Sequence, residues 1–448
     1  MKYTTLLTSL ILVVVIPTSY AQFLFQPSVT YSLTDQPTHL CAGDFNNDGK
    51  VDIATSNKYQ NSVSVLLGDG TGLLNFSASY AVGAFTHNVA TADFNGDGNA
   101  DLVTANTQSN DFSLLLGLGN GSFAQAVHFA AGVQPMGVAC ADFNGDGKYD
   151  VVLSLSGENY VVVFKGNGNG TFQVGSKYQT WGSKPNTMEH GDFNNDGKLD
   201  VIVGHANSPA SLAILLNDGV GGFLSPNVSP VVALAGAFVS AVFDVNSDGF
   251  LDAIQSALFG SERVYKGDGS GGILGIQVIN GGPDVHTSHC VADFNQDGFN
   301  DIAGCGDGSP MTISAGAAGI AAFTNYQTFV IGNGVMTYPQ HIIDCDLNGD
   351  GAKDIVVAET FGNRVVVFLN NIPTQIPVIE SKGSLLVYPN PARERLFFSE
   401  SNTATKQLTN FAGQLIVSTK GPVMDIQNLS KGLYLLRCGK HSRTILIE

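Results

Sequence analysis

The chain has 448 residues and a formal net charge of −17, with 44% hydrophobic and 13% charged residues. This hydrophobic content excludes a disordered chain, and the lack of any basic run or stripe excludes a nucleic-acid-binding protein. Glycine accounts for 53 residues, well above the usual level of about 7%, which is typical of many short strands joined by tight turns.

The N-terminus has the pattern of a signal peptide. Lys2 forms a short positive region, residues 6–16 form a mostly apolar run, and Ala21 ends a suitable cleavage site before Gln22. The run is shorter than the roughly 20 residues of a membrane-spanning helix, and no later run is long enough. We therefore predict export, with residues 1–21 as the signal peptide and an uncleaved anchor as the alternative.

The segment DFNNDGKVD, which begins at Asp44, concentrates three aspartates in nine positions. Asp44, Asn46 and Asp48 alternate, so a chain that curls can direct all three side-chain oxygens inward. Gly49 permits the sharp bend because glycine adopts positive φ without a clash, and Asp52 adds a carboxylate from the far side. Oxygen ligands at positions 1, 3, 5 and 9, with a backbone carbonyl near position 7, suit a hard cation such as calcium.

This segment occurs seven times, and the first aspartates lie 49, 49, 50, 52, 49 and 53 residues apart. A period near 50 residues indicates a repeat architecture. The seven segments are called the aspartate loops, and we predict one calcium ion in each, up to seven in all. In positions 1, 3, 5, 7 and 9 of each loop, the predicted metal-site residues are Asp44, Asn46, Asp48, Lys50, Asp52; Asp93, Asn95, Asp97, Asn99, Asp101; Asp142, Asn144, Asp146, Lys148, Asp150; Asp192, Asn194, Asp196, Lys198, Asp200; Asp244, Asn246, Asp248, Phe250, Asp252; Asp293, Asn295, Asp297, Phe299, Asp301; and Asp346, Asn348, Asp350, Ala352, Asp354.

Each repeat predicts four short strands. In the second repeat these strands are expected at residues 88–92, 102–106, 112–117 and 126–130. Four strands in a unit of this length describe one blade of a β-propeller, so seven units predict an all-β, seven-bladed ring over residues 22–372.

The seventh repeat stops after its third strand, near Asn371. Residues near 23–32 are therefore expected to complete the last blade and leave no open edge. The glycine-rich turns at Gly117 and Gly166 resemble phosphate-binding loops, but no helix follows them, so we do not expect a nucleotide site.

The repeats resemble FG-GAP and VCBS-type repeats, which occur in the calcium-bearing propeller of integrin α chains and in many secreted bacterial proteins. The resemblance covers residues 23–371 and rests on the aspartate loops and on later strands such as VSVLLGDG. The FG and GAP tokens themselves are degraded, so the chain is closer to the bacterial variant. The resemblance implies that each aspartate loop joins the first and second strands of a blade, with metal ligands at positions 1, 3, 5 and 9.

After the ring, a linker at residues 373–384 leads to a small C-terminal β-sandwich at residues 385–448. Its motifs YPNP at Tyr388, FAGQLI at Phe411 and LSKGLYLLR at Leu429 resemble a type IX secretion C-terminal sorting domain. The resemblance implies the type IX machinery as a partner and a secreted or outer-membrane-surface location. A carbohydrate-binding or spacer β-sandwich is the alternative for this tail.

Two classes of function fit the chain: a binding or adhesion module for glycan or protein ligands, and a secreted hydrolase or lyase built on a propeller. No span remains for a separate catalytic domain, and no Ser/His/Asp or Cys/His constellation stands out. We therefore predict the binding module and no enzyme, although fold alone does not decide function.

The face opposite the aspartate loops carries the more aromatic segments, at residues 57–62, 84–88, 180–186 and 337–341. Trp181, the only tryptophan, is either a ligand contact beside Lys184 or a packing residue between two blades.

Histidines and cysteines give weaker signals. His39 and His341 each lie five residues before a first aspartate, so they are expected to share a first-strand position near the channel. Near residues 284–290, Asp284, His286 and His289 are expected to form a polar loop with one inward histidine. Six cysteines form no disulfide framework, and a bridge between Cys290 and Cys305 is the one pairing considered.

Overall fold

The architecture comes from a computed structural model of the chain. It describes residues 23–371 except 208–210, 231–236, 247, 258–262, 279–285, 307–309, 317–322, 324–325 and 332–337, and in the tail residues 387–388, 395–398, 405–410, 414–420, 423–438 and 441–447. The predicted signal peptide and linker lie outside these residues. The chain divides into two compact units, Met1–Ile372 and Pro373–Glu448.

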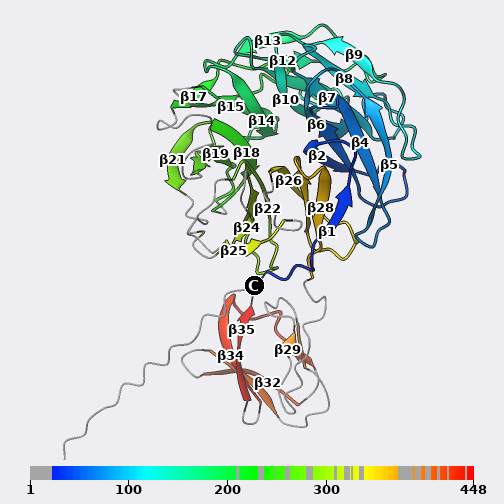
Figure 1. Ribbon diagram of the computed structural model, residues 1–448. Helices are drawn as coiled ribbons and strands as arrows, with labels where there is room; N and C mark the ends of the chain where they lie inside the picture. Colours follow the sequence, from blue (N-terminus) through cyan, green and yellow to red (C-terminus); the bar gives the residue numbers. More distant parts are fainter. Residues whose placement is uncertain are drawn as a thin grey trace, which may run out of the picture. The chain divides into compact units, whose positions relative to one another are not determined.

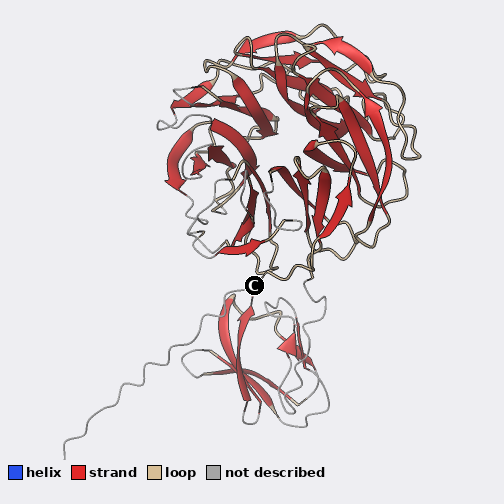
Figure 2. Cartoon of the chain, in the orientation of Figure 1, coloured by secondary structure: helices blue, strands red, loops and turns tan. Residues whose placement is uncertain are grey.

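The first unit contains seven four-stranded antiparallel sheets, shown as red arrows in Figure 2. In Figure 1 the first strand of each blade lies nearest the middle of the ring. Blades one to four are β2 (Pro37–Gly43), β3 (Asp52–Asn57), β4 (Ser62–Gly68), β5 (Leu74–Ala81); β6 (Thr86–Ala92), β7 (Asp101–Asn106), β8 (Asp111–Leu115), β9 (Val127–Ala130); β10 (Pro135–Ala141), β11 (Asp150–Leu155), β12 (Tyr160–Phe164), β13 (Ser176–Gln179); and β14 (Pro185–Gly191), β15 (Asp200–His205), β16 (Ser211–Leu215), β17 (Asn227–Pro230).

Blades five and six have the same order, and blade seven closes the ring. Their strands are β18 (Ala237–Phe243), β19 (Asp252–Ala257), β20 (Arg263–Gly267), β21 (Ile273–Val278); β22 (Ser288–Ala292), β23 (Asp301–Cys305), β24 (Met311–Ser314), β25 (Tyr326–Phe329); and β26 (Pro339–Cys345), β27 (Asp354–Glu359), β28 (Arg364–Phe368), with β1 (Val29–Ser32) as the fourth strand. The predicted seven-bladed fold is confirmed, and the predicted strands of blade two differ from the observed ones by no more than two residues at either end.

Ring closure joins the two ends of the propeller. β1 pairs antiparallel with β28, and Val29 lies opposite Val367. The first-unit N-terminus therefore completes the last blade as expected, and the edge of β28 is paired instead of exposed.

Burial explains the pattern of each strand. The second strands, such as β3, β7 and β11, are buried along their whole length, because both faces pack against neighbouring blades. They therefore appear in the sequence as continuous apolar or small-residue runs without alternation. The outer strands β9 and β13 are largely exposed.

The second unit contains two small sheets. A three-stranded sheet has β29 (Val387–Tyr388), β30 (Arg395–Phe398) and β33 (Val423–Asp425), and a four-stranded sheet has β32 (Leu415–Thr419), β31 (Lys406–Thr409), β34 (Gly432–Cys438) and β35 (His441–Ile447). Leu396, Leu408 and Met424 form part of its buried core. No helical segment capable of crossing a membrane occurs in the described part of either unit.

The structure decides the one cysteine pairing that the sequence left open. Cys290 and Cys305 form no disulfide. In the β22–β23 register Cys290 lies opposite Ala303, and Cys305 lies opposite Ser288. The two thiols are therefore not cross-strand partners, although they share one apolar cluster.

Candidate functional sites

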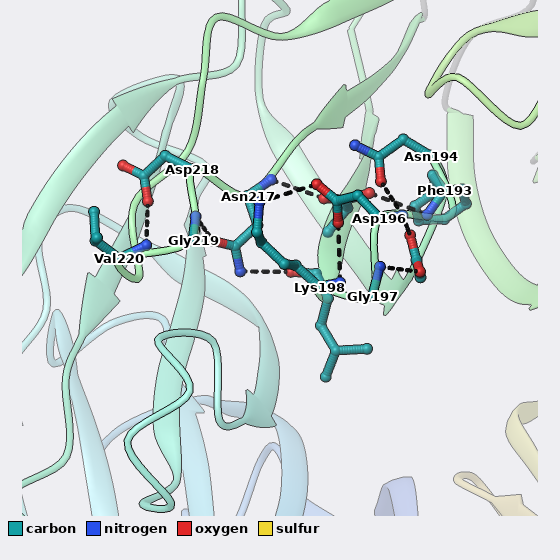
Figure 3. A network of polar contacts seen from close by, with 12 residues as sticks. Phe193, Asn194, Asp196, Gly197, Lys198, Asn217, Asp218, Gly219 and Val220 are labelled. Atoms are coloured by element: carbon teal, nitrogen blue, oxygen red, sulfur yellow. Dashed lines mark hydrogen bonds and ion pairs between the residues drawn. The ribbon is translucent and has the colours of Figure 1, made fainter.

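The aspartate loops fold around their own side chains. In the first loop Gly49 N–H donates to Asp44 Oδ2 at 2.8 Å, Asp48 N–H donates to Asn46 Oδ1 at 3.0 Å, and Lys50 N–H donates to Asp48 Oδ1 at 3.0 Å. The same three bonds recur in all seven loops. Figure 3 shows this arrangement in the fourth loop, around Asn194, Asp196 and Gly197.

The ninth-position aspartates have a different environment. Asp52 is completely buried, and its two carboxylate oxygens accept hydrogen bonds from Phe45 N–H at 2.8 Å and Gly68 N–H at 2.7 Å. Every blade repeats this pair, from position 2 of the loop and from the end of the third strand. The ninth carboxylate therefore connects the loop to the third strand of the same blade.

Burial raises the pKa of these ninth carboxyls. It brings the pKa of Asp101 and Asp150 to about 6 and that of Asp301 to about 7, with the aspartates at positions 1 and 5 adding to the rise and the two amide bonds opposing it. Because the pKa is raised above its ordinary value, each such carboxyl stabilises the metal-free fold in acid, and this contribution is lost as the pH rises through about 6. At neutral pH, where these carboxyls are charged, a nearby cation would therefore stabilise the fold.

The donor set fits a hard cation. Positions 1, 3 and 5 provide only carboxylate and amide oxygens, and the carboxyls at positions 1 and 5 lie close enough to Asp52 to raise its pKa. In the described residues no three carboxylate, imidazole or thiolate groups converge tightly enough to hold a metal ion, and loop amides bond to the carboxylate oxygens. A cation would thus draw together donors that one short loop already supplies.

The side chain at position 7 differs from loop to loop. The seven residues there include lysine, asparagine, phenylalanine and alanine, so only the carbonyl could serve as a shared ligand. In the first and fourth loops the lysine ammonium instead lies 3.2 Å from Asp48 Oδ2 and 3.1 Å from Asp196 Oδ2. These two lysines are internal counter-ions for the loops.

The loops also join neighbouring blades. The position-2 carbonyl of Phe45 accepts a bond from Gly121 N–H at 2.8 Å, and that of Phe94 accepts one from Gly170 N–H at 3.0 Å. The side chains of these phenylalanines are buried in clusters shared with the next blade. Sequence analysis did not detect this role, and the glycine turns that resemble phosphate loops are blade-to-blade joints.

Comparison with known proteins identifies the repeats. A model of the FG-GAP-like repeat matches residues 44–104, 93–153, 142–203 and 192–254, and a model of the secretion system C-terminal sorting domain matches residues 386–447. The chain therefore contains FG-GAP-like repeats over residues 44–254 and a type IX C-terminal sorting domain over residues 386–447. No curated protein matches it.

Solved structures share the fold of the FG-GAP propeller. BBS1N in complex with ARL6DN has a TM-score of 0.55 at 6% identity, covering 79% of this chain and 98% of that chain. Virginiamycin B lyase from Staphylococcus aureus has a TM-score of 0.52 at 11% identity, and the match covers 77% of this chain and 99% of that chain. Saccharomyces cerevisiae Sqt1 has a TM-score of 0.51 at 12% identity, and the match covers 78% of this chain and 99% of that chain. At such identities the likeness shows the fold alone.

The inner strands of the FG-GAP propeller line a central cavity of about 290 Å³. His39 and His341 share the predicted first-strand position, at the third residue of β2 and β26. Their rings stack there with centroids 4.2 Å apart, and the His87 ring lies 5.5 Å from that of His39. Burial among protein atoms lowers the pKa of His87 to about 3 and of His341 to about 4. It also raises the pKa of Glu189 to about 7. The imidazoles are therefore neutral donors and acceptors at neutral pH.

A second pocket of about 260 Å³ lies at the opposite end of the blades from the aspartate loops. Antiparallel order places the turns between second and third strands, and the connections between blades, at that end. Three of the four aromatic segments predicted for this face meet there. The pocket, called the aromatic pocket, is lined by Thr38, His39, Lys58, Tyr59, His87, Tyr338, Gln340, Thr360 and Phe361.

The fourth aromatic segment does not line the aromatic pocket. Trp181 is 66% exposed, so of the two roles considered for it, packing between two blades is wrong. Trp181 has a φ of +59° and Lys184 a φ of +56°, as in a tight connection. The side chains of both residues are exposed. Trp181 is a separate exposed aromatic on this face.

The histidines before blade six are buried and hydrogen-bonded. His286 Nε2 lies 2.9 Å from Thr312 Oγ1, and His289 Nδ1 lies 2.8 Å from Ser240 Oγ. Both are inward-facing, whereas the sequence predicted one. Asp284 lies outside the described residues.

Within one aspartate loop the ninth aspartate is buried and the fifth is exposed, so substitutions at the two positions should change stability differently. Asp150→Asn places an amide against two backbone N–H donors, so we expect a loss of about 2 kcal/mol in unfolding free energy even in a chelator. Asp146→Ala changes an exposed side chain and should cost less than about 0.5 kcal/mol under the same conditions. Urea unfolding in chelator measures both. Equal losses for the two variants would contradict the assignment.

Proposed function

We propose that this protein is an exported, calcium-stabilised propeller that acts as a binding module at the cell surface, with the aromatic pocket as its ligand site. The observation that carries the proposal is the meeting of three sequence-distant aromatic segments in one pocket. The sorting domain supports export by the type IX machinery. Binding of a glycan or protein ligand, and not catalysis, is the activity we assign.

The repeat itself shows that the fold does not require these aromatics. Tyr59 and Phe361 occupy the same place in the turn between second and third strands, and they are 53% and 57% exposed. The equivalent residues in blades two, three and four are Gln108, Gly157 and Asn207. In blades one, two, three and seven the turn keeps an asparagine with positive φ, at Asn61, Asn110, Asn159 and Asn363, although the residue at the Tyr59 position differs. Exposed aromatics in a concave site are typical of ligand recognition.

Tyr59 and Phe361 are also held in place by aromatic neighbours. Tyr59 packs edge-on against Phe85 with centroids 5.8 Å apart, and Phe361 packs edge-on against Tyr338 at 4.6 Å. Because Tyr59 and Phe361 line the pocket and each packs against a second ring, the ordering cost of binding is reduced.

Calcium removal tests the metal assignment. Extracellular modules bind calcium with dissociation constants of about 0.1–1 mM, so a site at the tight end contributes about 1.4 kcal/mol at about 1 mM calcium, and seven contribute about 10 kcal/mol. We expect a chelator to lower the melting temperature sharply and calcium to restore it. An unchanged melting curve, with no metal found by elemental analysis, would contradict the proposal.

Calcium affinity should fall in acid. The carboxyls of Asp101, Asp150 and Asp200 have a pKa raised to about 6, so protons compete with calcium below that pH. Titration calorimetry should show about fourfold weaker binding per site at about pH 5.5 than at about pH 7.5. Carboxyls with an ordinary pKa would leave the affinity nearly constant over this range.

Ligand screening tests the pocket. A glycan and protein array probed with the mature chain in calcium should give hits that Tyr59→Ala and Phe361→Ala each weaken by about tenfold or more. Trp181→Ala is the matched control, because it removes an exposed aromatic from the same face outside the pocket. If Trp181→Ala weakens binding and Tyr59→Ala and Phe361→Ala do not, the ligand site lies at Trp181 and not in the aromatic pocket.

Deletion of the tail tests the route of export. A chain without residues 385–448 should still fold as a propeller, because the two units are compact on their own, and it should accumulate inside the outer membrane. Cell fractionation and calcium-dependent melting measure the two outcomes. Truncated protein at the cell surface would refute the role of the tail.

A further inference from the structure

The aromatic pocket contains an ammonium group without a counter-ion. Lys58 is partly buried, and desolvation lowers its pKa. No carboxylate pairs with it within the described part of the chain; its Nζ lies over the Phe85 ring, 4.5 Å from the centroid, and 5.9 Å from that of Tyr59. In a chain with a formal charge of −17, an unpaired, partly desolvated cation is unusual and favours an anion from outside.

The repeat shows that Lys58 replaces a structural contact. The equivalent residues in blades two and seven are Thr107 and Thr360, whose hydroxyls donate to the carbonyls of Pro135 and Pro37 at 2.8 Å. Each of these bonds joins a turn to the inner strand of the next blade. At the joint between blades one and two, the threonine is replaced by Lys58. The ammonium of Lys58 therefore does not make the bond between blades that this position makes in blades two and seven.

The rest of the pocket suits a sugar ring. Its volume of about 260 Å³ lies below the range of about 300–1,000 Å³ that drug-sized ligands occupy, so it accepts one compact group. The faces of Tyr59 and Phe361 can contact the C–H side of a pyranose. Neutral His39 and His87, with Gln340, offer hydrogen-bonding groups for hydroxyls.

We propose that the aromatic pocket binds an acidic sugar residue whose carboxylate pairs with Lys58, between the rings of Tyr59 and Phe361. This inference rests on the proposed function and specifies its ligand class. The carboxylate supplies the charge that Lys58 lacks, and the ring packs against the aromatic pairs. A charge-assisted hydrogen bond in a partly desolvated pocket is stronger than a neutral one and discriminates by charge.

The test uses a matched pair of probes and the mature full-length chain in calcium. One oligosaccharide ends in glucuronic acid and the other in glucose, so the two differ only in the terminal carboxylate. We expect wild type to bind the acidic probe about tenfold or more tightly than the neutral one, with the preference reduced by salt. Lys58→Met should abolish the preference, and Lys58→Arg should retain most of it.

Lys184→Met is the control, because Lys184 is an exposed lysine on the same face outside the aromatic pocket. It should leave the preference unchanged, and all variants should melt near the wild-type temperature. Equal affinity for the two probes, or a preference that survives Lys58→Met, would overturn the acidic-sugar inference. Binding of an acidic peptide through Lys58, with neither sugar bound, would also overturn it. After any of these results the proposed binding function still stands if Tyr59→Ala abolishes binding. If neither Tyr59→Ala nor Phe361→Ala changes the binding of the probes, the proposed function itself is overturned.

Discussion

The propeller depends on the hydrogen bonds that the buried carboxylate at position 9 of each aspartate loop accepts. This carboxylate accepts one backbone N–H from its own loop and one from the end of the third strand, as Asp52 does with Phe45 and Gly68. A buried carboxylate without these donors would be strongly unfavourable. The bonds hold the loop so that the position-2 residue, a phenylalanine in five of the seven loops, lies at the joint between blades. The ninth carboxyl connects loop and third strand in every blade, and the carbonyls of Phe45 and Phe94 in addition bond to the next blade.

This arrangement gives the aspartates of one loop separate tasks. The aspartates at positions 1 and 5, such as Asp44 and Asp48, are held by amides of an exposed loop and remain accessible to a cation. The ninth aspartate is buried, and its pKa is raised by that burial, with a smaller contribution from the aspartates at positions 1 and 5. A bound cation would relieve that cost at the point where the blades are joined. The proposed calcium sites would therefore stabilise the ring as a whole more than any one loop.

The two ends of the blades differ in what the fold demands of them. At the loop end nearly every residue is tied to a hydrogen bond or to a core contact that recurs in each blade. At the opposite end the turns keep their backbone, but their side chains are free to vary, as the series Tyr59, Gln108, Gly157 and Phe361 shows. A repeat protein can change such positions without loss of its frame. Recognition of a ligand is therefore expected at that end, and the aromatic pocket lies there.

The sequence by itself determined the repeat, the number of blades, the closing strand and the sorting tail, because spacing and motif order are properties of the linear chain. It also determined the donor residues of the aspartate loops, since their oxygens lie within nine positions of one another. Only the tertiary structure decided that the ninth carboxylates, such as Asp150, are bonded to backbone from another strand, and that Cys290 and Cys305 do not face each other. Only the closed ring brings Lys58 and Tyr59 of blade one beside Phe361 of blade seven, about 300 residues away. The pocket depends on this contact between the first and last blades, and the identity of the side chains that meet there follows only from the folded ring.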